Sequence, residues 1–238
     1  MGFIDIHTHI IPNVDDGAKG FDEAIVRIRG LHSFGIDTII ATPHKRGELF
    51  DFDEELVKRN FNLLSNRLIE EGIGVKIYLG AEYYFGVDLF EDIGGNTLYT
   101  LGNSKYILVE FKSLRFSQQD RERLFRIFTS GYKIVVAHIE RHRFNSESFS
   151  TLEYLKNNSA LFQCDIMSLS GLWGEEARLF MEELLNRNLV DVIATDVHCK
   201  EFESGLLEKG FSRLKELRGD GSLESFMGEV LKKRLNLL

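Results

Sequence analysis

Short apolar runs alternate along the chain with longer segments in which apolar residues recur every three or four positions. One short run, residues 134–136 (Ile-Val-Val), is continuously apolar, which is typical of a parallel strand buried on both faces. The short runs predict seven strands, at 3–7, 38–42, 75–80, 106–111, 133–137, 161–165 and 190–195.

The longer segments predict helices between these strands. Ala24, Ile28 and Leu31 recur at helical spacing before Gly35, and similar stripes run over 61–68, 124–128, 177–184 and from 206 onward. Strands that alternate with helices indicate an α/β fold with a parallel sheet, either closed as a barrel or open. No linker-like segment interrupts the pattern, so we expect one domain over residues 1–238.

Composition excludes several classes of protein. The net charge of −8 argues against a protein that binds nucleic acid through its overall field. No apolar run reaches the roughly 18 residues that a membrane span requires, and no secretory signal precedes Asp5 and His7. Cys164 and Cys199 form no C-x-x-C pair, so we expect a protein of the reducing cytoplasm without a disulfide framework.

Chemically active residues gather at the ends of the predicted strands. Five of the seven histidines and several carboxylates lie at or just after such an end, where the strands of a parallel barrel converge on one mouth. His32 lies inside a helical pattern and is expected to be structural or exposed. Spacing does not decide between Asp15 and Asp16 after the first strand. The set comprises His7, His9, Asp15 or Asp16, His44, Glu82, Glu110, His138, Asp196 and His198.

Such a set predicts a multinuclear metal site. Any one strand-end histidine is more often an ordinary loop residue, but independent explanations for every member are improbable. Four carboxylates with neutral histidines carry a charge of about −4, which two or three divalent cations would balance. Residues two apart on a strand, such as His7 and His9, share a face and can share an ion. Mixed nitrogen and oxygen ligands favour Mn, Fe, Zn or Co.

An ordered series of motifs resembles a known family. It consists of D-I-H-T-H at 5–9, V-D-D-G at 14–17, T-P-H at 42–44, G-A-E at 80–82, E-F at 110–111, A-H-I-E-R at 137–141 and T-D-V-H at 195–198. The series is similar to the PHP (polymerase and histidinol phosphatase) superfamily. It most resembles the manganese-dependent bacterial protein-tyrosine phosphatases encoded with capsule and exopolysaccharide synthesis genes.

The resemblance implies a distorted (β/α)7 barrel of the PHP type with a metal-activated hydroxide at a trinuclear, manganese-containing centre. It implies that Arg141 contacts the substrate phosphate and that the substrate is a phosphotyrosine protein, namely a bacterial tyrosine autokinase. A further arginine of that family, a few residues after T-D-V-H, is replaced here by a stretch that contains Lys200. The implied metal ligands are His7, His9, Asp16, His44, Glu82, Glu110, His138, Asp196 and His198.

Other functions are less well supported. A cysteine-nucleophile phosphatase needs an arginine six residues after the cysteine, but Ser170 follows Cys164 and Gly205 follows Cys199 at that spacing. A phosphodiesterase or exonuclease is disfavoured by the acidic charge. The alternatives that stay open are a small-molecule phosphatase, for example one acting on histidinol phosphate, and a non-catalytic, metal-loaded module that docks a tyrosine kinase.

Overall fold

Each of the seven predicted strands is present in the structure, a computed structural model that describes residues 2–45, 52–142, 146–198 and 205–237. Two further short strands, β3 and β5, were not predicted because they contain only two and three residues. The strands in the described residues are β1 (Phe3–Thr8), β2 (Ile36–Ala41), β3 (His44–Lys45), β4 (Lys76–Leu79), β5 (Glu82–Tyr84), β6 (Tyr106–Glu110), β7 (Lys133–Val136), β8 (Leu161–Asp165) and β9 (Val192–Ala194).

All strand pairs are parallel, in the orders β1-β2-β4 and β3-β5-β6-β7-β8-β9. The chain passes from β2 to β3 through Thr42 and Pro43, and from β4 to β5 through Gly80 and Ala81. Backbone pairing continues across both interruptions, since Gly80 N donates to Ala41 O (2.8 Å) and Glu82 N donates to Pro43 O (3.1 Å). Each short strand therefore extends the strand before it.

The first and last strands are also joined. Asp196 N, just after β9, donates to His7 O on β1 (2.8 Å), and Thr8 forms a parallel bridge with Val197. The seven strand lines therefore follow one another around a distorted ring, as a (β/α)7 arrangement requires. The predicted α/β class, with parallel strands and outer helices, is confirmed.

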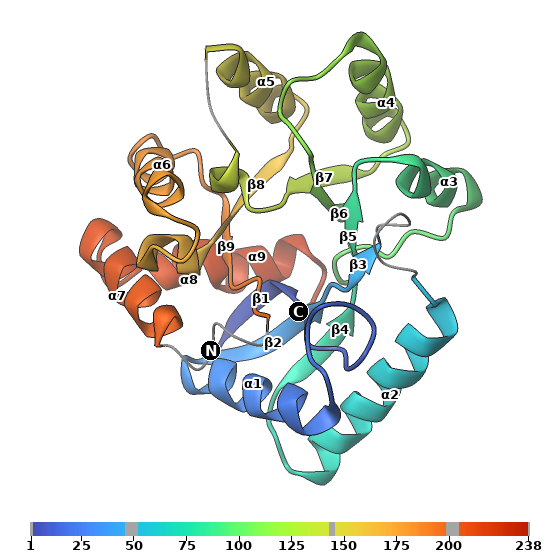
Figure 1. Cartoon of the computed structure of the whole chain (residues 1–238), viewed down its shortest axis with the longest axis vertical. Coiled ribbons are helices and arrows are strands. Elements are labelled where there is room, and N and C mark those ends of the chain that lie inside the picture. Colours follow the sequence, from blue (N-terminus) through green and yellow to red (C-terminus); the bar gives the residue numbers. More distant parts are fainter. Residues whose placement is uncertain (1, 46–51, 143–145, 199–204, 238) are drawn as a thin grey trace.

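Helices surround the strands (Figure 1). Two of them, α3 and α5, were not predicted; α3 ends in Gly94-Gly95, which in sequence is typical of a loop. The predicted C-terminal helix is three helices, separated at Gly219 and Gly228. The helices in the described residues are α1 (Phe21–Ser33), α2 (Glu54–Glu70), α3 (Val87–Gly95), α4 (Gln118–Thr129), α5 (Ser146–Asn157), α6 (Glu175–Asn186), α7 (Leu206–Arg218), α8 (Ser222–Met227) and α9 (Glu229–Arg234).

None of the helices in the described ranges combines the length and the apolar character that a membrane crossing needs.

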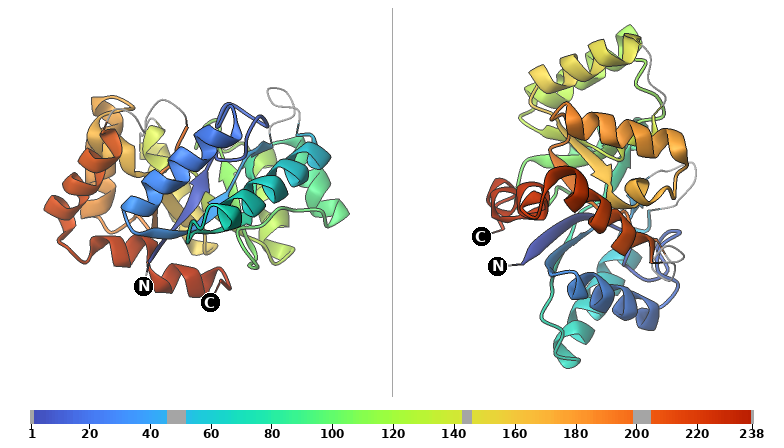
Figure 2. Two further views of the ribbon diagram at one scale, coloured as in Figure 1. Left: turned by 90° about the horizontal axis from the view of Figure 1, so that it is seen from below. Right: turned by 90° about the vertical axis from the view of Figure 1, so that its left-hand side faces the viewer.

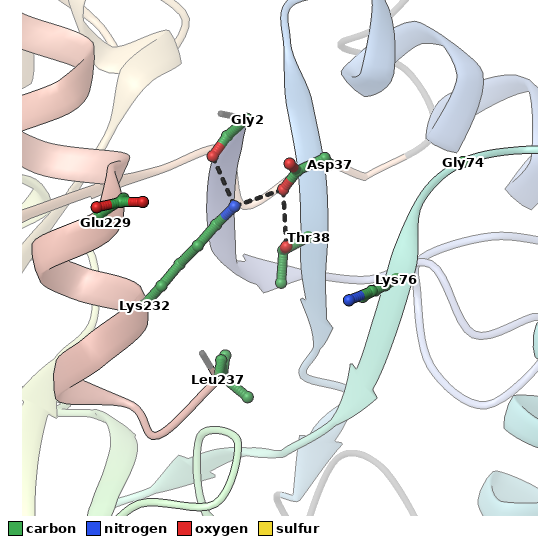
Figure 3. A pocket seen from close by; sticks show the side chains of 8 residues that line it. All are labelled: Gly2, Asp37, Thr38, Gly74, Lys76, Glu229, Lys232 and Leu237. Carbon is green, nitrogen blue, oxygen red and sulfur yellow. Dashed lines mark hydrogen bonds and ion pairs between the residues drawn. The ribbon is translucent and has the colours of Figure 1, made fainter.

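Helix α9 covers the end of the ring at which the strands begin (Figure 2). Leu231 and Leu235 pack with Ile4, Ile6 and other strand residues into one buried cluster. A pocket of about 270 Å³ lies beside this contact (Figure 3).

The side chain of Lys232 on α9 fastens the helix to the first two strands. Its Nζ donates to Gly2 O (2.6 Å) and to Asp37 Oδ1 (2.5 Å). Burial alone would raise the pKa of Asp37, but the hydrogen bonds from Lys232 and Thr38 and the charge of Lys232 together outweigh burial and lower it.

The opposite, carboxyl end of the ring is polar. Side chains alternate along a strand, so the face that buries Leu108 on β6 also carries Glu110, and the face that buries Ala194 on β9 leads to Asp196. The strand sequences therefore place acidic residues at the carboxyl end of the ring, above an apolar interior.

Candidate metal centre

Glu82, at the start of β5, lies at the centre of the predicted histidines and is 1% exposed. Its Oε2 lies 3.3 Å from His7 Nε2 and 2.9 Å from His44 Nδ1. Its Oε1 lies 3.0 Å from His138 Nε2. One buried carboxylate therefore faces imidazoles from three different strand ends.

Asp196 is the second buried carboxylate of the centre. Its Oδ1 lies 3.1 Å from His7 Nε2 and 3.2 Å from His9 Nε2, and its Oδ2 accepts a hydrogen bond from Arg141 Nη2 (2.7 Å). Its backbone φ is +46°, and that of His138 is +30°. Positive φ is uncommon for residues other than glycine and often occurs at functional sites.

The two aspartates of the loop after β1 have different surroundings. Asp16 Oδ1 lies 3.4 Å from His44 Nε2 and 3.2 Å from His198 Nε2, and its side chain is 53% exposed. Asp15 Oδ2 instead lies 2.8 Å from His9 Nδ1, behind the ring, and accepts a hydrogen bond from His44 N (3.2 Å). The geometry thus places Asp16 inside the cluster and Asp15 behind it.

This loop also explains a glycine of the V-D-D-G motif. Gly17 packs so closely that a Cβ there would lie 2.1 Å from His9 O. Ala18 N donates to the same oxygen (3.0 Å), which folds the loop back over His9. A side chain at position 17 would push both aspartates away from the histidines.

The structure brings all nine predicted residues together. Potential ligand atoms lie within 4.8 Å of one another in each of three overlapping groups, and His138 adjoins them through Glu82. Ligand atoms about 2.1 Å from a shared ion lie about 3 to 4 Å apart, so this spacing suits metal ions. The groups are His7, His9, Glu82 and Asp196; His9, Asp16, His44 and His198; and His44, Glu82 and Glu110.

Hydrogen bonds behind the rings fix how two histidines face the centre. His9 Nδ1 points at the Asp15 carboxylate, and His198 Nδ1 points at the backbone oxygen of Asp196 (2.9 Å). Both partners only accept, so Nδ1 carries the proton in each ring and Nε2 points inward. Neutral Nε2 atoms directed at carboxylates repel them unless a proton or a metal ion lies between.

Electrostatics lead to the same requirement for positive charge. Burial alone would lower the pKa of His9, but Asp15, Asp196 and Glu82 outweigh burial and hold it well above its usual value. Burial likewise opposes ionisation of Glu82, yet the adjacent histidines hold its pKa well below the ordinary range. The cluster therefore binds positive charge strongly, and its nitrogen and oxygen donors fit divalent transition-metal ions.

Arg141 lies in the 3₁₀ turn η1 (Ile139–Arg141), three residues after His138. Its Nη2 donates to both Asp165 and Asp196, and the guanidinium carbon lies 3.8 Å from the ring centre of Trp173. Burial alone would lower its pKa, but Asp196 and Asp165 outweigh burial and raise it, so the guanidinium stays charged. Its side chain is 21% exposed.

Two residues that support Arg141 were missed from the sequence. Trp173 is 42% exposed and its Nε1 donates to Asp165 Oδ2 (2.5 Å). Burial raises the pKa of Asp165 to about 6, although Arg141 opposes the shift. Asp165 ends a predicted strand, which was a usable signal, whereas nothing in the sequence marks Trp173.

Four further residues near the motifs or of a reactive type lie as follows in the structure. Lys45, directly after His44, is held by its neighbours: its Nζ lies 2.5 Å from Asp92 Oδ2 and 4.9 Å from the ring centre of Phe52. Lys200 lies outside the described residues. Cys164 is buried in β8, which is one of the predicted strands. His32 is exposed on α1, with Nδ1 3.1 Å from Ile36 O.

His142 gives a prediction about pH. Burial lowers its pKa to about 4, with smaller contributions from His138 and Arg141, so the folded state binds this proton less readily than the unfolded chain. Its stabilising contribution is complete above the ordinary pKa near 6.5 and is lost as pH falls toward 4. We expect His142→Gln to reduce the loss of stability between pH 7.5 and 5 by about 1 to 2 kcal/mol.

Urea unfolding of the metal-free protein at the two pH values measures this difference. His32→Gln, which changes an exposed histidine on α1, is the matched control and should follow the wild type. Parallel pH dependence of wild type and His142→Gln would show that His142 ionises equally in both states.

Comparison with known proteins places this geometry in context. The family described as "Capsular polysaccharide synthesis, CpsB/CapC" matches residues 3–234. The tyrosine-protein phosphatase YwqE of Bacillus subtilis (strain 168) is 33% identical over 195 residues, which is 82% of this chain and 77% of YwqE. The family match over residues 3–234 includes every residue of the cluster.

Solved structures agree with the sequence comparison. A solved structure from a pair described as unique metal-dependent tyrosine phosphatases, YwqE from Bacillus subtilis and CpsB from Streptococcus pneumoniae, matches this chain with a TM-score of 0.85 and 30% sequence identity. The match covers 98% of this chain and 94% of the solved chain. Histidinol phosphate phosphatase from Lactococcus lactis, complexed with Zn, L-histidinol and phosphate, has a TM-score of 0.56 at 16% identity, covering 91% and 94%. The second likeness concerns the fold alone.

Proposed function

Because this chain belongs to the CpsB/CapC family of capsular polysaccharide synthesis, we propose that it is a metal-dependent protein-tyrosine phosphatase. The observation that carries the proposal is the convergence of two buried carboxylates, Glu82 and Asp196, with histidines whose Nε2 atoms point inward. Such a centre suits hydrolysis of a phosphate ester, because divalent ions supply the Lewis acidity that generates a hydroxide nucleophile near neutral pH.

The proposed ligands form an inner, buried group and an outer group nearer the solvent. The inner group consists of His7, His9, Glu82 and Asp196, all of which are buried. The outer group includes the half-exposed Asp16. Two or three ions would balance the four carboxylates, and manganese is the expected metal. The complete proposed set is His7, His9, Asp16, His44, Glu82, Glu110, His138, Asp196 and His198.

Arg141 is the proposed phosphate contact. Asp165 and Trp173 hold its guanidinium beside Asp196, so it is oriented before a substrate arrives. A planar guanidinium can donate two parallel hydrogen bonds to phosphoryl oxygens, over which negative charge spreads in the transition state. The phenolate of phosphotyrosine, whose conjugate acid has a pKa near 10, leaves more readily than an alkoxide.

The exposure of the outer residues suits a substrate presented by another protein. Asp16, Arg141 and Trp173 are partly exposed, as is the outer ligand His198, whereas the inner ligands are closed to solvent. The proposed partner is a phosphotyrosine-containing protein, and specifically a bacterial tyrosine autokinase. The free Cys164 thiol is compatible with the reducing cytoplasm as the compartment.

Chelation followed by metal addition tests the proposed function. We expect removal of metal by a chelator to lower hydrolysis of a phosphotyrosine peptide at least about 10²-fold, and added Mn²⁺ to restore it. Para-nitrophenyl phosphate and histidinol phosphate are assayed in parallel. His138→Ala should not recover with Mn²⁺, whereas the matched control His32→Ala should recover like the wild type.

Each outcome has a defined meaning. Higher catalytic efficiency on histidinol phosphate than on the peptide would replace the proposed function by a small-molecule phosphatase. Tight metal binding without activity on any of the substrates would favour a metal-loaded docking module. Full activity after exhaustive chelation would contradict the metal requirement itself.

A further inference from the structure

Gln163 is a fully buried polar residue within the buried strand β8, and it is not one of the proposed ligands. Its Oε1 lies 2.7 Å from His138 N and 3.2 Å from His7 Nδ1. A single oxygen therefore contacts two proposed ligands that come from β1 and from the end of β7.

The backbone determines how this amide is oriented. His138 N–H is always a donor, so the atom of Gln163 that faces it must be the carbonyl oxygen and not the amide nitrogen. The same oxygen faces His7 Nδ1 and has no proton to donate. His7 Nδ1 must therefore carry the proton, which leaves Nε2 free to face Glu82 and Asp196.

His138 depends on the same oxygen in a different way. Its backbone lies in the left-handed region, at φ +30° and ψ +55°, which is unfavourable for residues other than glycine. The hydrogen bond from its N–H to Gln163 holds the chain at this turn. From there the ring of His138 reaches Glu82, with Nε2 3.0 Å from Oε1.

The orientation of the Gln163 side chain leaves its own amide nitrogen without a hydrogen bond. Gln163 Nε2 is buried and has no hydrogen-bond partner among the described residues. Turning the amide over would bring this nitrogen against the N–H of His138, so the two contacts of Oε1 decide the orientation. An apolar residue would be the simpler choice at a position that served only packing.

We propose that Gln163 is a positioning residue, which sets the proton of His7 on Nδ1 and holds the backbone of His138 so that both rings present Nε2 to metal. The proposal rests on the proposed function only in that His7 and His138 bind metal. Groups that hydrogen-bond the far side of a ligating histidine fix its tautomer and orientation, and their loss typically weakens metal binding about 10- to 100-fold.

Two substitutions separate this role from packing. Gln163→Leu removes the acceptor, and we expect the Kd for Zn²⁺, measured by competition with a chelator, to rise about 10- to 100-fold. Gln163→Glu keeps an oxygen facing both donors, so its Kd should stay within about threefold of wild type or be lower. Gln119→Leu, at an exposed position on α4, is the matched control and should leave the Kd unchanged.

Unchanged affinity in Gln163→Leu would overturn the proposal, as would an equal loss in Gln163→Glu. ¹⁵N spectra of the Zn²⁺-loaded wild type test it without any substitution, and therefore also if Gln163→Leu fails to fold. We expect His7 to carry its proton on Nδ1, and a proton on Nε2 would overturn the proposal.

These measurements do not depend on catalysis. If the affinities and the tautomer are as expected but the protein does not hydrolyse phosphotyrosine, the role of Gln163 is supported and only the proposed function is contradicted. A wild-type protein that bound no divalent ion would overturn both.

Discussion

Asp196→Asn is expected to lower kcat/KM on a phosphotyrosine peptide on the order of 10³-fold, because the variant cannot neutralise the metal charge. The wild-type carboxylate faces the Nε2 atoms of His7 and His9 and also accepts a hydrogen bond from Arg141. The neutral amide keeps the shape of the side chain but weakens all three contacts. Steady-state kinetics at saturating Mn²⁺ and metal content after dialysis measure the effect.

The comparison requires a carboxylate that does not adjoin the centre. Asp220→Asn, at an exposed position after α7, should keep wild-type kinetics and metal content. Thermal unfolding in the presence of metal separates loss of the centre from loss of the fold. Near wild-type turnover in a folded Asp196→Asn protein would remove Asp196 from the proposed ligand set.

Arg141→Lys is expected to lower kcat/KM about 10²-fold while changing metal affinity less than about threefold. Lysine keeps the positive charge between Asp165 and Asp196 but offers one ammonium group in place of a planar pair of donors. It also loses the contact of the guanidinium with the Trp173 ring. Kinetics on the peptide, together with a separate metal titration, distinguish phosphate binding from metal binding.

Arg178→Lys is the matched control, since Arg178 forms ion pairs with Glu175 and Glu182 within α6 and contacts no member of the centre. It should retain full activity. A variant at position 141 that binds metal normally and hydrolyses the peptide at the wild-type rate would show that phosphate is bound by other groups.

Much of the fold could be predicted because buried parallel strands have a strong local pattern. Strand β7 is continuously apolar after Lys133, and all three residues at 134–136 are buried. The short strands β3 and β5 could not be predicted, since two or three residues carry no periodicity. Their pairing depends on neighbours distant in sequence, such as Glu82 opposite Leu108. Helix α3 was missed because its two terminal glycines favour a loop.

The candidate site was predictable to the extent that position along a strand determines position in space. His44 and Asp196 follow strand ends, and the fold brings them to the same mouth. Which residue stands behind a ring could not be predicted in this way. Gln163 and Asp15 act through side-chain contacts between strands and loops, and a single sequence does not record those pairings.

The contact between Arg141 and Trp173 also places the intrinsic fluorophore of the protein at the proposed phosphate site. Trp173 is the only tryptophan in the chain, so all indole emission comes from a ring whose centre lies 3.8 Å from this guanidinium carbon. Its Nε1 is hydrogen-bonded to Asp165, so the emission depends on the charge state of that carboxyl as well. We therefore expect the intrinsic fluorescence to change when the mouth is occupied, without a label or an engineered chromophore.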